Sequence, residues 1–167
     1  LKLPKIGQVR LKQHRFVPSE YRLKSVTVSQ TPSGKYYASI LFEYEDQVQE
    51  KKLQKFLGLD FSMHELYRDS NGKEPAYPGY YRNAEKKLAR EQRKLSRMQK
   101  GSNNRSRQRI KVAKLHEKVS SQRKDFLHKL SRQTADAYDC VCIESLDMKA
   151  MSQMLNFGKS VSDNGWG

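Results

Sequence analysis

The chain concentrates its excess positive charge in one segment, residues 82–132. This segment contains 18 Lys or Arg and 4 Asp or Glu, whereas the rest of the chain contains 15 basic and 14 acidic residues. Charge of this density is compatible with a solvated or protein-binding helical face, a membrane-surface helix or a nucleic-acid-binding track. A membrane-surface helix needs a broad apolar face rich in Trp, Phe and Leu, which this segment lacks. We therefore favour nucleic acid and keep a solvated or protein-binding face as the alternative.

Composition excludes several other classes of protein. The most apolar stretch, residues 36–42, is far shorter than the roughly 20 residues of a membrane span, and the chain does not open with a signal peptide. Cys140 and Cys142 are the only cysteines, too few for a disulfide framework or a four-cysteine zinc site. We expect a soluble, cytoplasmic protein.

Alternating and β-branched segments predict strands in the first 54 residues. We expect strands at 9–13, 23–29 and 35–44, the last two joined as a hairpin by the Thr31-Pro32-Ser33-Gly34 turn. This part resembles a piece of a small β-barrel or sheet. Residues 55–79 then predict three short strands in a meander, at 56–61, 65–68 and 73–77, with a tight turn at 69–72.

The basic segment has a helical pattern. Apolar residues at three- and four-residue spacing predict helices over 80–98 and 105–138, with Gly101 as a C-cap and Asn104 as an N-cap. The second helix has a narrow apolar stripe formed by Val112, Leu115, Val119, Phe126, Leu130, Thr134 and Ala137. We therefore expect a basic antiparallel hairpin over residues 80–138.

Residues 139–145 predict a further strand, which opens the last segment, 139–167. Its continuous apolar run indicates a strand buried on both faces. Residues 146–154 predict a loop or a short helix.

Two carboxylates, Asp60 and Glu144, each close an apolar strand. Taken singly, either could be a strand-end cap or an ion-pair partner. Together, after a three-stranded meander, helices and a fourth strand, they indicate an α/β fold of the ribonuclease-H type, in which the first and fourth strands lie parallel and adjacent. Two acids meeting at one point favour a divalent ion such as Mg²⁺ or Mn²⁺, and a pair of such ions can support phosphodiester cleavage.

Several motifs occur in an order that resembles the transposon-encoded TnpB (OrfB) family, which is related to type V CRISPR effectors. They are Leu57-Gly58-Leu59-Asp60, the basic run 86–97, Lys100-Gly101-Ser102, residues 122–129 and residues 143–148, with residues 3–7 and 163–167 also in agreement. The resemblance implies an RNA-guided DNA endonuclease with a RuvC-like core, with guide RNA and DNA as partners, in a prokaryotic cytoplasm. It implies that Asp60 and Glu144 are the first two catalytic, metal-binding acids and that residues 1–54 belong to a wedge domain, a β-barrel that holds guide RNA. We expect the nucleic-acid-binding residues to be Lys86, Lys87, Arg90, Arg93, Lys94, Arg97, Arg105, Arg107, Arg109, Arg123 and Lys124.

The chain departs from the family pattern in two ways. Ser62 stands where the family commonly has Gly. The family's third catalytic Asp, its zinc ribbon and its N-terminal half have no counterpart here. We therefore expect a fragment or a truncated product that does not cleave alone, with zinc only in the missing C-terminal part. The alternative is a catalytically inactive nucleic-acid-binding remnant or regulator.

Other polar and aromatic residues have more than one interpretation. Cys140 and Cys142 are interpreted as core thiols rather than ligands. Tyr77, Tyr80 and Tyr81 could stack on bases or pack at the entry to the hairpin. Asp147 could support the acid pair, although a loop cap is the preferred interpretation. His116 and His128 are interpreted as nucleic-acid or solvent contacts.

Overall fold

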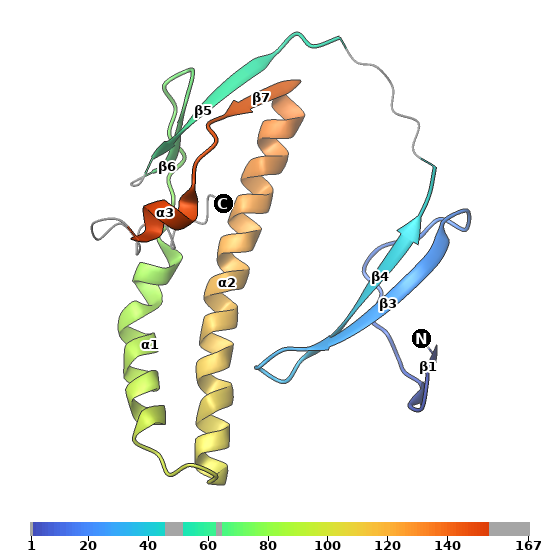
Figure 1. Cartoon of the computed structure of the whole chain (residues 1–167), viewed down its shortest axis with the longest axis vertical. Helices are drawn as coiled ribbons and strands as arrows, with labels where there is room; N and C mark the ends of the chain where they lie inside the picture. The colour runs from blue at the N-terminus through green and yellow to red at the C-terminus, as the bar shows by residue number, and fades with distance from the viewer. Residues whose placement is uncertain (1, 46–51, 63–64, 154–167) are drawn as a thin grey trace. The chain divides into compact units, whose positions relative to one another are not determined.

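The computed structural model describes residues 2–45, 52–62 and 65–153. The elements in chain order are β1 (Lys2–Leu3), β2 (Gly7–Gln8), β3 (Arg22–Gln30), β4 (Tyr36–Glu43), β5 (Phe56–Ser62), β6 (Leu66–Asp69), α1 (Tyr80–Ser96), α2 (Asn103–Ala137), β7 (Cys140–Ile143) and α3 (Met148–Gln153) (Figure 1). Contacts divide the chain into two compact units, one of residues 1–31 and 35–49 and one of residues 32–34 and 50–167. The mixed α/β class is confirmed. The four-segment division predicted from the sequence stays a prediction.

The first unit contains a long antiparallel hairpin. β3 pairs with β4 from Arg22 opposite Glu43 to Gln30 opposite Tyr36, with one irregularity between Leu23 and Ser25. The Thr31 N–H donates to the Lys35 carbonyl at 2.8 Å, and Gly34 adopts φ +90°, which only glycine adopts easily. The predicted hairpin is therefore present. The predicted strand at 9–13 is wrong: β1 and β2 pair through the preceding turn, and in the described part of this unit the strands form two separate pairs rather than a closed barrel.

The second unit is built on a three-stranded sheet in the order β6-β5-β7. β5 pairs antiparallel with β6 and parallel with β7, although β7 lies beyond both helices of the hairpin in sequence. Leu57 and Leu66 are almost completely buried, which identifies β5 and β6 as the core strands.

The third meander strand, predicted at 73–77, is wrong. Residues 73–79 carry no strand in the structure. The Asp69 carboxylate accepts hydrogen bonds from the N–H groups of Asn71 at 2.9 Å and Lys73 at 2.8 Å, which closes the turn as a compact loop. Pro75 then lacks the N–H that a paired strand would need.

β7 lies at the edge of the sheet that the described strands form, and the prediction that it is buried on both faces is wrong. Val141 is 37% and Ile143 65% exposed, and Cys142 is exposed. A short edge strand can be as apolar as a buried one, and composition alone does not separate the two cases.

α1 and α2 form the predicted antiparallel hairpin, which Figure 1 shows as two adjacent helices joined at one end. Leu88 packs on one side of the interface and Val112 and Val119 on the other, all at most 9% exposed. The N-cap of α2 is Ser102, whose Oγ accepts from the Arg105 N–H at 3.2 Å, rather than the predicted Asn104. Neither helix, nor any other in the described residues, is long and apolar enough to cross a membrane.

Candidate active site and nucleic-acid surface

Asp60 and Glu144 come together at one end of the three-stranded sheet. The parallel register pairs Gly58 with Cys142 and Leu59 with Ile143. The residues that follow next on the β5 side and on the β7 side are Asp60 and Glu144. Residues opposite each other in neighbouring strands point to the same face of a sheet. Both acids line one open hollow, together with Arg68 and Cys142.

Asp139 holds the register that makes this arrangement. Its Oδ2 accepts hydrogen bonds from the main-chain N–H groups of Gln54 at 3.1 Å and Lys55 at 3.0 Å. The Lys55 carbonyl accepts in return from the N–H groups of Asp139 at 2.9 Å and Cys140 at 3.1 Å. These bonds fix the start of β7 against the start of β5, four to six residues before the acids.

The two acids have no partners in the part of the chain that the structure describes. Both residues are exposed, and among the described residues their side-chain carboxylates accept no hydrogen bond and form no ion pair. A strand-end cap would hydrogen-bond to nearby N–H groups, as Asp69 does in the same hollow. The two carboxylates are therefore not explained as structural caps.

A divalent ion is compatible with this donor set. Mg²⁺ commonly takes one or two carboxylates and keeps several water ligands. The structure holds no cluster of three or more His, Cys, Asp or Glu suited to a metal within its described ranges. Among the described acids of the hollow, Asp60 and Glu144 are the two whose carboxylates are available to a metal, because Asp69, which also lines it, accepts two hydrogen bonds in its own turn.

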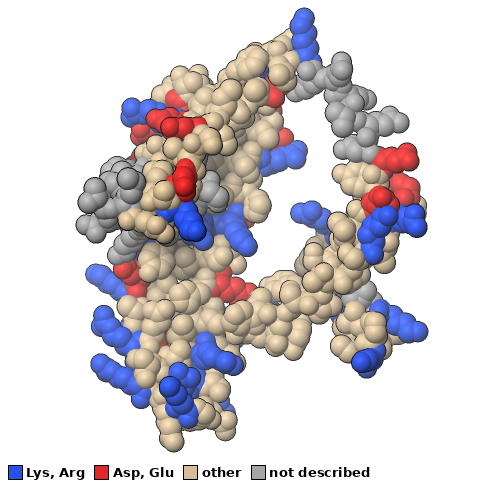
Figure 2. Space-filling view, viewed as in Figure 1, with Lys and Arg blue, Asp and Glu red and all other residues tan. Residues whose placement is uncertain are grey.

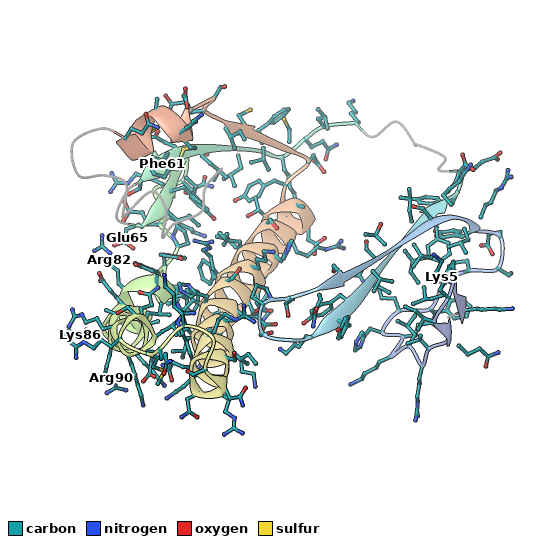
Figure 3. The ribbon with its side chains drawn as sticks, turned by 60° about the horizontal axis from the view of Figure 1, so that its bottom comes forward. Lys5, Phe61, Glu65, Arg82, Lys86 and Arg90 are labelled. Atoms are coloured by element: carbon teal, nitrogen blue, oxygen red, sulfur yellow. The ribbon has the colours of Figure 1, made fainter. Side chains whose placement is uncertain are left out.

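A basic surface covers the outer side of the hairpin. Figure 2 shows Lys and Arg gathered along its lower part, and Figure 3 shows Arg82, Lys86 and Arg90 on the side of α1 that faces away from α2. Of the residues predicted to bind nucleic acid, those exposed are Lys86, Lys87, Arg90, Arg93, Lys94, Arg97, Arg107, Arg109 and Lys124. Arg105 and Arg123 are half-buried, and the Arg105 Nε is buried with no hydrogen-bond partner in the described part of the chain. Arg105 is therefore less accessible than the prediction assumed.

A buried carboxylate joins the two helices beneath this surface. Glu91 is 5% exposed, and its Oε2 accepts from Gln108 Nε2 at 2.8 Å and pairs with Lys111 Nζ at 3.0 Å. Gln108 also donates to the Glu91 carbonyl at 3.1 Å. The hydrogen bonds from Gln108 and Lys111 lower the pKa of Glu91 from 4.5 to about 2. Glu91 therefore remains charged at neutral pH and neutralises part of the basic hairpin from inside.

Aromatic residues pack where the hairpin begins. The rings of Tyr77 and Tyr80 meet Phe126 edge-on, with centroids 5.5 and 6.2 Å apart. Core packing therefore accounts for these two tyrosines. Asp147 is a loop cap, because its Oδ1 accepts from the Ala150 N–H at 2.9 Å at the start of α3.

The thiols are less buried than predicted. Cys142 is exposed and Cys140 is half-buried, so the interpretation of both as core thiols is wrong. Burial and the neighbouring Cys142 thiol raise the pKa of Cys140. The reason for their exposure is again that β7 lies at the sheet edge.

The structure also identifies functional candidates that the sequence did not. Arg68 lies in the acid hollow, and Asp139 sets the strand register, yet neither stands out in a sequence of many charged residues. The turn signal at 69–72 could have indicated Arg68, because Arg68 directly precedes this turn, at the end of a strand that lies beside β5. Glu91 and Gln108 lie at positions where the two helices face each other. A search for regularly spaced apolar residues passes over them because their side chains are polar.

These features define a mixed α/β protein in which a small sheet with two exposed acids at one end is joined to a basic helical hairpin. The chain belongs to the family OrfB_IS605, described as "Probable transposase", whose model matches residues 39–155. The resemblance seen in the sequence is thereby confirmed.

Two curated relatives match most of the chain. It is 32% identical over 179 residues to the "Putative RNA-guided DNA endonuclease InsQ" of Escherichia coli strain K12, which covers 98% of this chain and 44% of the relative. It is 32% identical over 152 residues to a "Putative RNA-guided DNA endonuclease" of Streptomyces pristinaespiralis, which covers 91% of this chain and 38% of the relative. The chain thus spans less than half the length of these relatives.

Proposed function

We propose that the chain is the nucleic-acid-binding, acid-bearing part of a TnpB-like, RNA-guided DNA endonuclease with a RuvC-type core. The observation that carries this proposal is the parallel register of β5 and β7, which brings the Asp60 and Glu144 carboxylates to one open hollow, where they form no hydrogen bond or ion pair with the described residues. The names of the relatives, which concern RNA-guided DNA cleavage, support the same activity.

In this proposal Asp60 and Glu144 hold Mg²⁺ or Mn²⁺. An ion held by these two carboxylates would supply Lewis-acid chemistry for phosphodiester cleavage. The two carboxylates supply hard oxygen ligands from adjacent strands, and the sheet fixes their separation. Asp139 keeps the strands in register, so that the two carboxylates stay on one face.

The outer surface of the hairpin binds the phosphate backbone of guide RNA, target DNA or their heteroduplex. In RNA-guided effectors base pairing reads the sequence, and the protein contacts the backbone. Exposed Arg and Lys on one face of a long helical hairpin suit that role, since phosphate contacts carry no sequence information. The Glu91 cluster holds the two helices together beneath this surface.

The second candidate is a nucleic-acid-binding remnant or regulator without catalysis. It is favoured by the donors of the acid hollow: the third acid that lines it, Asp69, accepts two hydrogen bonds in its own turn, and the described residues contain no group of three or more side chains suited to a metal. The two candidates share the basic surface and differ in cleavage.

Cleavage assays on the 167-residue chain and on a longer version that restores the length of the relatives separate the candidates. The substrate is DNA matched to a bound guide RNA, with Mg²⁺. We expect nucleic-acid binding by both proteins and cleavage by the longer one only, abolished by Asp60→Ala and by Glu144→Ala. A longer protein that binds guide and target but never cleaves would establish the inactive remnant.

A further inference from the structure

One cationic side chain lies in the acid hollow. Arg68 on β6 is the cross-strand partner of Asp60, and it lines the same hollow as Asp60 and Glu144. Cross-strand partners lie on one face of the sheet, with Cβ atoms about 4.5–5.5 Å apart. Among the described residues that line the hollow, Arg68 is the one Lys, Arg or His.

The guanidinium of Arg68 is held by Glu74 rather than by the acid pair. Arg68 Nε donates to Glu74 Oε1 at 2.6 Å, and Arg68 Nη2 lies 2.5 Å from the same oxygen. Within the described residues Arg68 forms no ion pair with Asp60. A guanidinium carries five N–H donors, so the edge bound to Glu74 leaves donors on the other side for an anion. The side chain of Arg68 is 67% exposed, so a ligand can reach it.

We propose that Arg68 binds a backbone phosphate of the DNA strand in the acid hollow, beside Asp60 and Glu144. The proposal rests on the proposed function and assigns a substrate-contacting residue to its site. A DNA strand entering the hollow meets three carboxylates of its own sign of charge, those of Asp60, Asp69 and Glu144. Arg68 offsets that repulsion and, because Glu74 orients it, places the phosphate at a fixed position relative to the acids. The opposing interpretation is a surface ion pair between Arg68 and Glu74, which contributes little by itself.

Cys142 provides a probe inside the hollow. The chain has two cysteines, and in Cys140→Ser the hollow-lining Cys142 is the single thiol. The experiment measures how fast neutral iodoacetamide alkylates Cys142 as single-stranded DNA of about 20 nucleotides is added. Ca²⁺ replaces Mg²⁺ so that carboxylates can bind a metal while the DNA stays intact. Total binding to the chain is followed in parallel by fluorescence anisotropy.

We expect DNA to protect Cys142 from alkylation. In Arg68→Ala, the DNA concentration needed for half-maximal protection should rise about five- to tenfold, the loss expected for one charge-assisted contact. The same variant should reduce the log–log salt slope of protection by about 0.7, since one single-strand phosphate contact is lost. Arg68→Lys keeps the positive charge and should keep the salt slope of protection. Protection should be weaker because an ammonium group lacks the paired N–H donors of the planar guanidinium. Glu74→Gln removes the ion pair but keeps the cation, and the Gln side-chain oxygen is still an acceptor that can orient Arg68, so protection should be unchanged or stronger.

Three outcomes overturn the proposal, and they differ in what they imply for the proposed function. Unchanged protection and slope in Arg68→Ala would refute the role of Arg68 and leave the nuclease proposal standing. Equal losses in Arg68→Ala and Glu74→Gln would assign Arg68 to the ion pair alone. DNA that binds the chain without protecting Cys142 would remove the hollow as the substrate site, and the nuclease proposal with it. If circular dichroism shows that Arg68→Ala is unfolded, the contrast between Arg68→Lys and Glu74→Gln decides.

Discussion

The carboxylate of Asp139 accepts a hydrogen bond from the main-chain N–H of Lys55 at 3.0 Å, across 84 positions of sequence. Together with the bond from Gln54, this contact fixes where β7 starts along β5. A shift of one residue would turn Glu144 to the opposite face of the sheet from Asp60. The separation of the acid pair therefore depends on a third acid that lies outside the hollow.

Removing the Asp139 carboxylate should weaken the sheet. Asp139→Ala leaves the N–H groups of Gln54 and Lys55 without their acceptor, and we expect a loss of about 1.5–3 kcal/mol in the free energy of unfolding. Urea denaturation measures the loss, and amide hydrogen exchange at Gln54 and Lys55 should become faster. Asp139→Asn keeps one acceptor oxygen and should lose less. Unchanged exchange at both amides would contradict the register role.

Asp60→Asn should not destabilise the metal-free chain. Because Asp60 and Glu144 repel each other without an ion between them, we expect the free energy of unfolding in EDTA to stay constant or rise slightly. Mn²⁺ affinity, measured by electron paramagnetic resonance, should fall. Asp69→Asn is the matched control: Asp69 lines the same hollow but accepts two turn hydrogen bonds, so its loss should cost about 1 kcal/mol. A stability loss in Asp60→Asn similar to that of Asp69→Asn would favour a structural cap.

Nucleic-acid binding should depend steeply on salt. If about eight basic groups of the hairpin neutralise phosphates, the log–log slope should be about −6 to −7. Reversing the charge of exposed Arg93, Lys94 and Arg97 together should flatten the slope by roughly two to three. Fluorescence anisotropy at several salt concentrations measures both slopes. Identical slopes in the two proteins would locate the binding surface elsewhere.

The helical hairpin should lose stability in acid through Glu91. The pKa of Glu91 is lowered from 4.5 to about 2 in the folded chain. Its contribution is therefore complete above pH 4.5 and is lost as the pH falls towards 2, because protonation removes the charge that Lys111 and Gln108 stabilise. Helical circular dichroism during urea denaturation between pH 2 and 6 measures it. Glu91→Gln should be less stable at pH 6 and lose less on acidification; an equal pH dependence in both proteins would contradict this account.

The core of the sheet should depend on Leu57. This side chain is 3% exposed, so Leu57→Ala should lower the free energy of unfolding by about 2–5 kcal/mol. Ile143→Ala is the control in the neighbouring strand, where 65% exposure predicts a change within about 0.5 kcal/mol. Urea denaturation gives both values. Similar losses at the two positions would mean that β7 is covered in solution.

From the sequence, local secondary structure was predicted better than the burial of side chains was. Apolar spacing and turn residues located the β3–β4 hairpin and both long helices, because these depend on neighbouring residues. The prediction of a strand at 73–77 was wrong because the Asp69 carboxylate closes a loop there and Pro75 has no N–H for strand pairing. An alternating apolar pattern represents neither effect. Exposure of β7 depends on strand order, a property of the whole sheet.

The approach of Asp60 to Glu144 was predicted from a resemblance to a known fold type, since no periodicity links strands separated by a helical hairpin. Arg68, Asp139 and Glu91 were not recognised for a related reason. Each acts through specific side-chain contacts that are seen only in three dimensions. Arg68 contacts Glu74, Asp139 accepts from the N–H groups of Gln54 and Lys55, and Glu91 contacts Gln108 and Lys111.

The long connection between β5 and β7 determines the order in which parts of the second unit fold. The pairing of these strands has to close a loop of about 80 residues, which is slow for a flexible chain. The helical hairpin forms from near neighbours, and by folding back on itself it brings the two ends of that loop together. The acid hollow should therefore appear after the hairpin, and a substitution at the distant Gly101 turn should slow its formation even though it touches neither carboxylate.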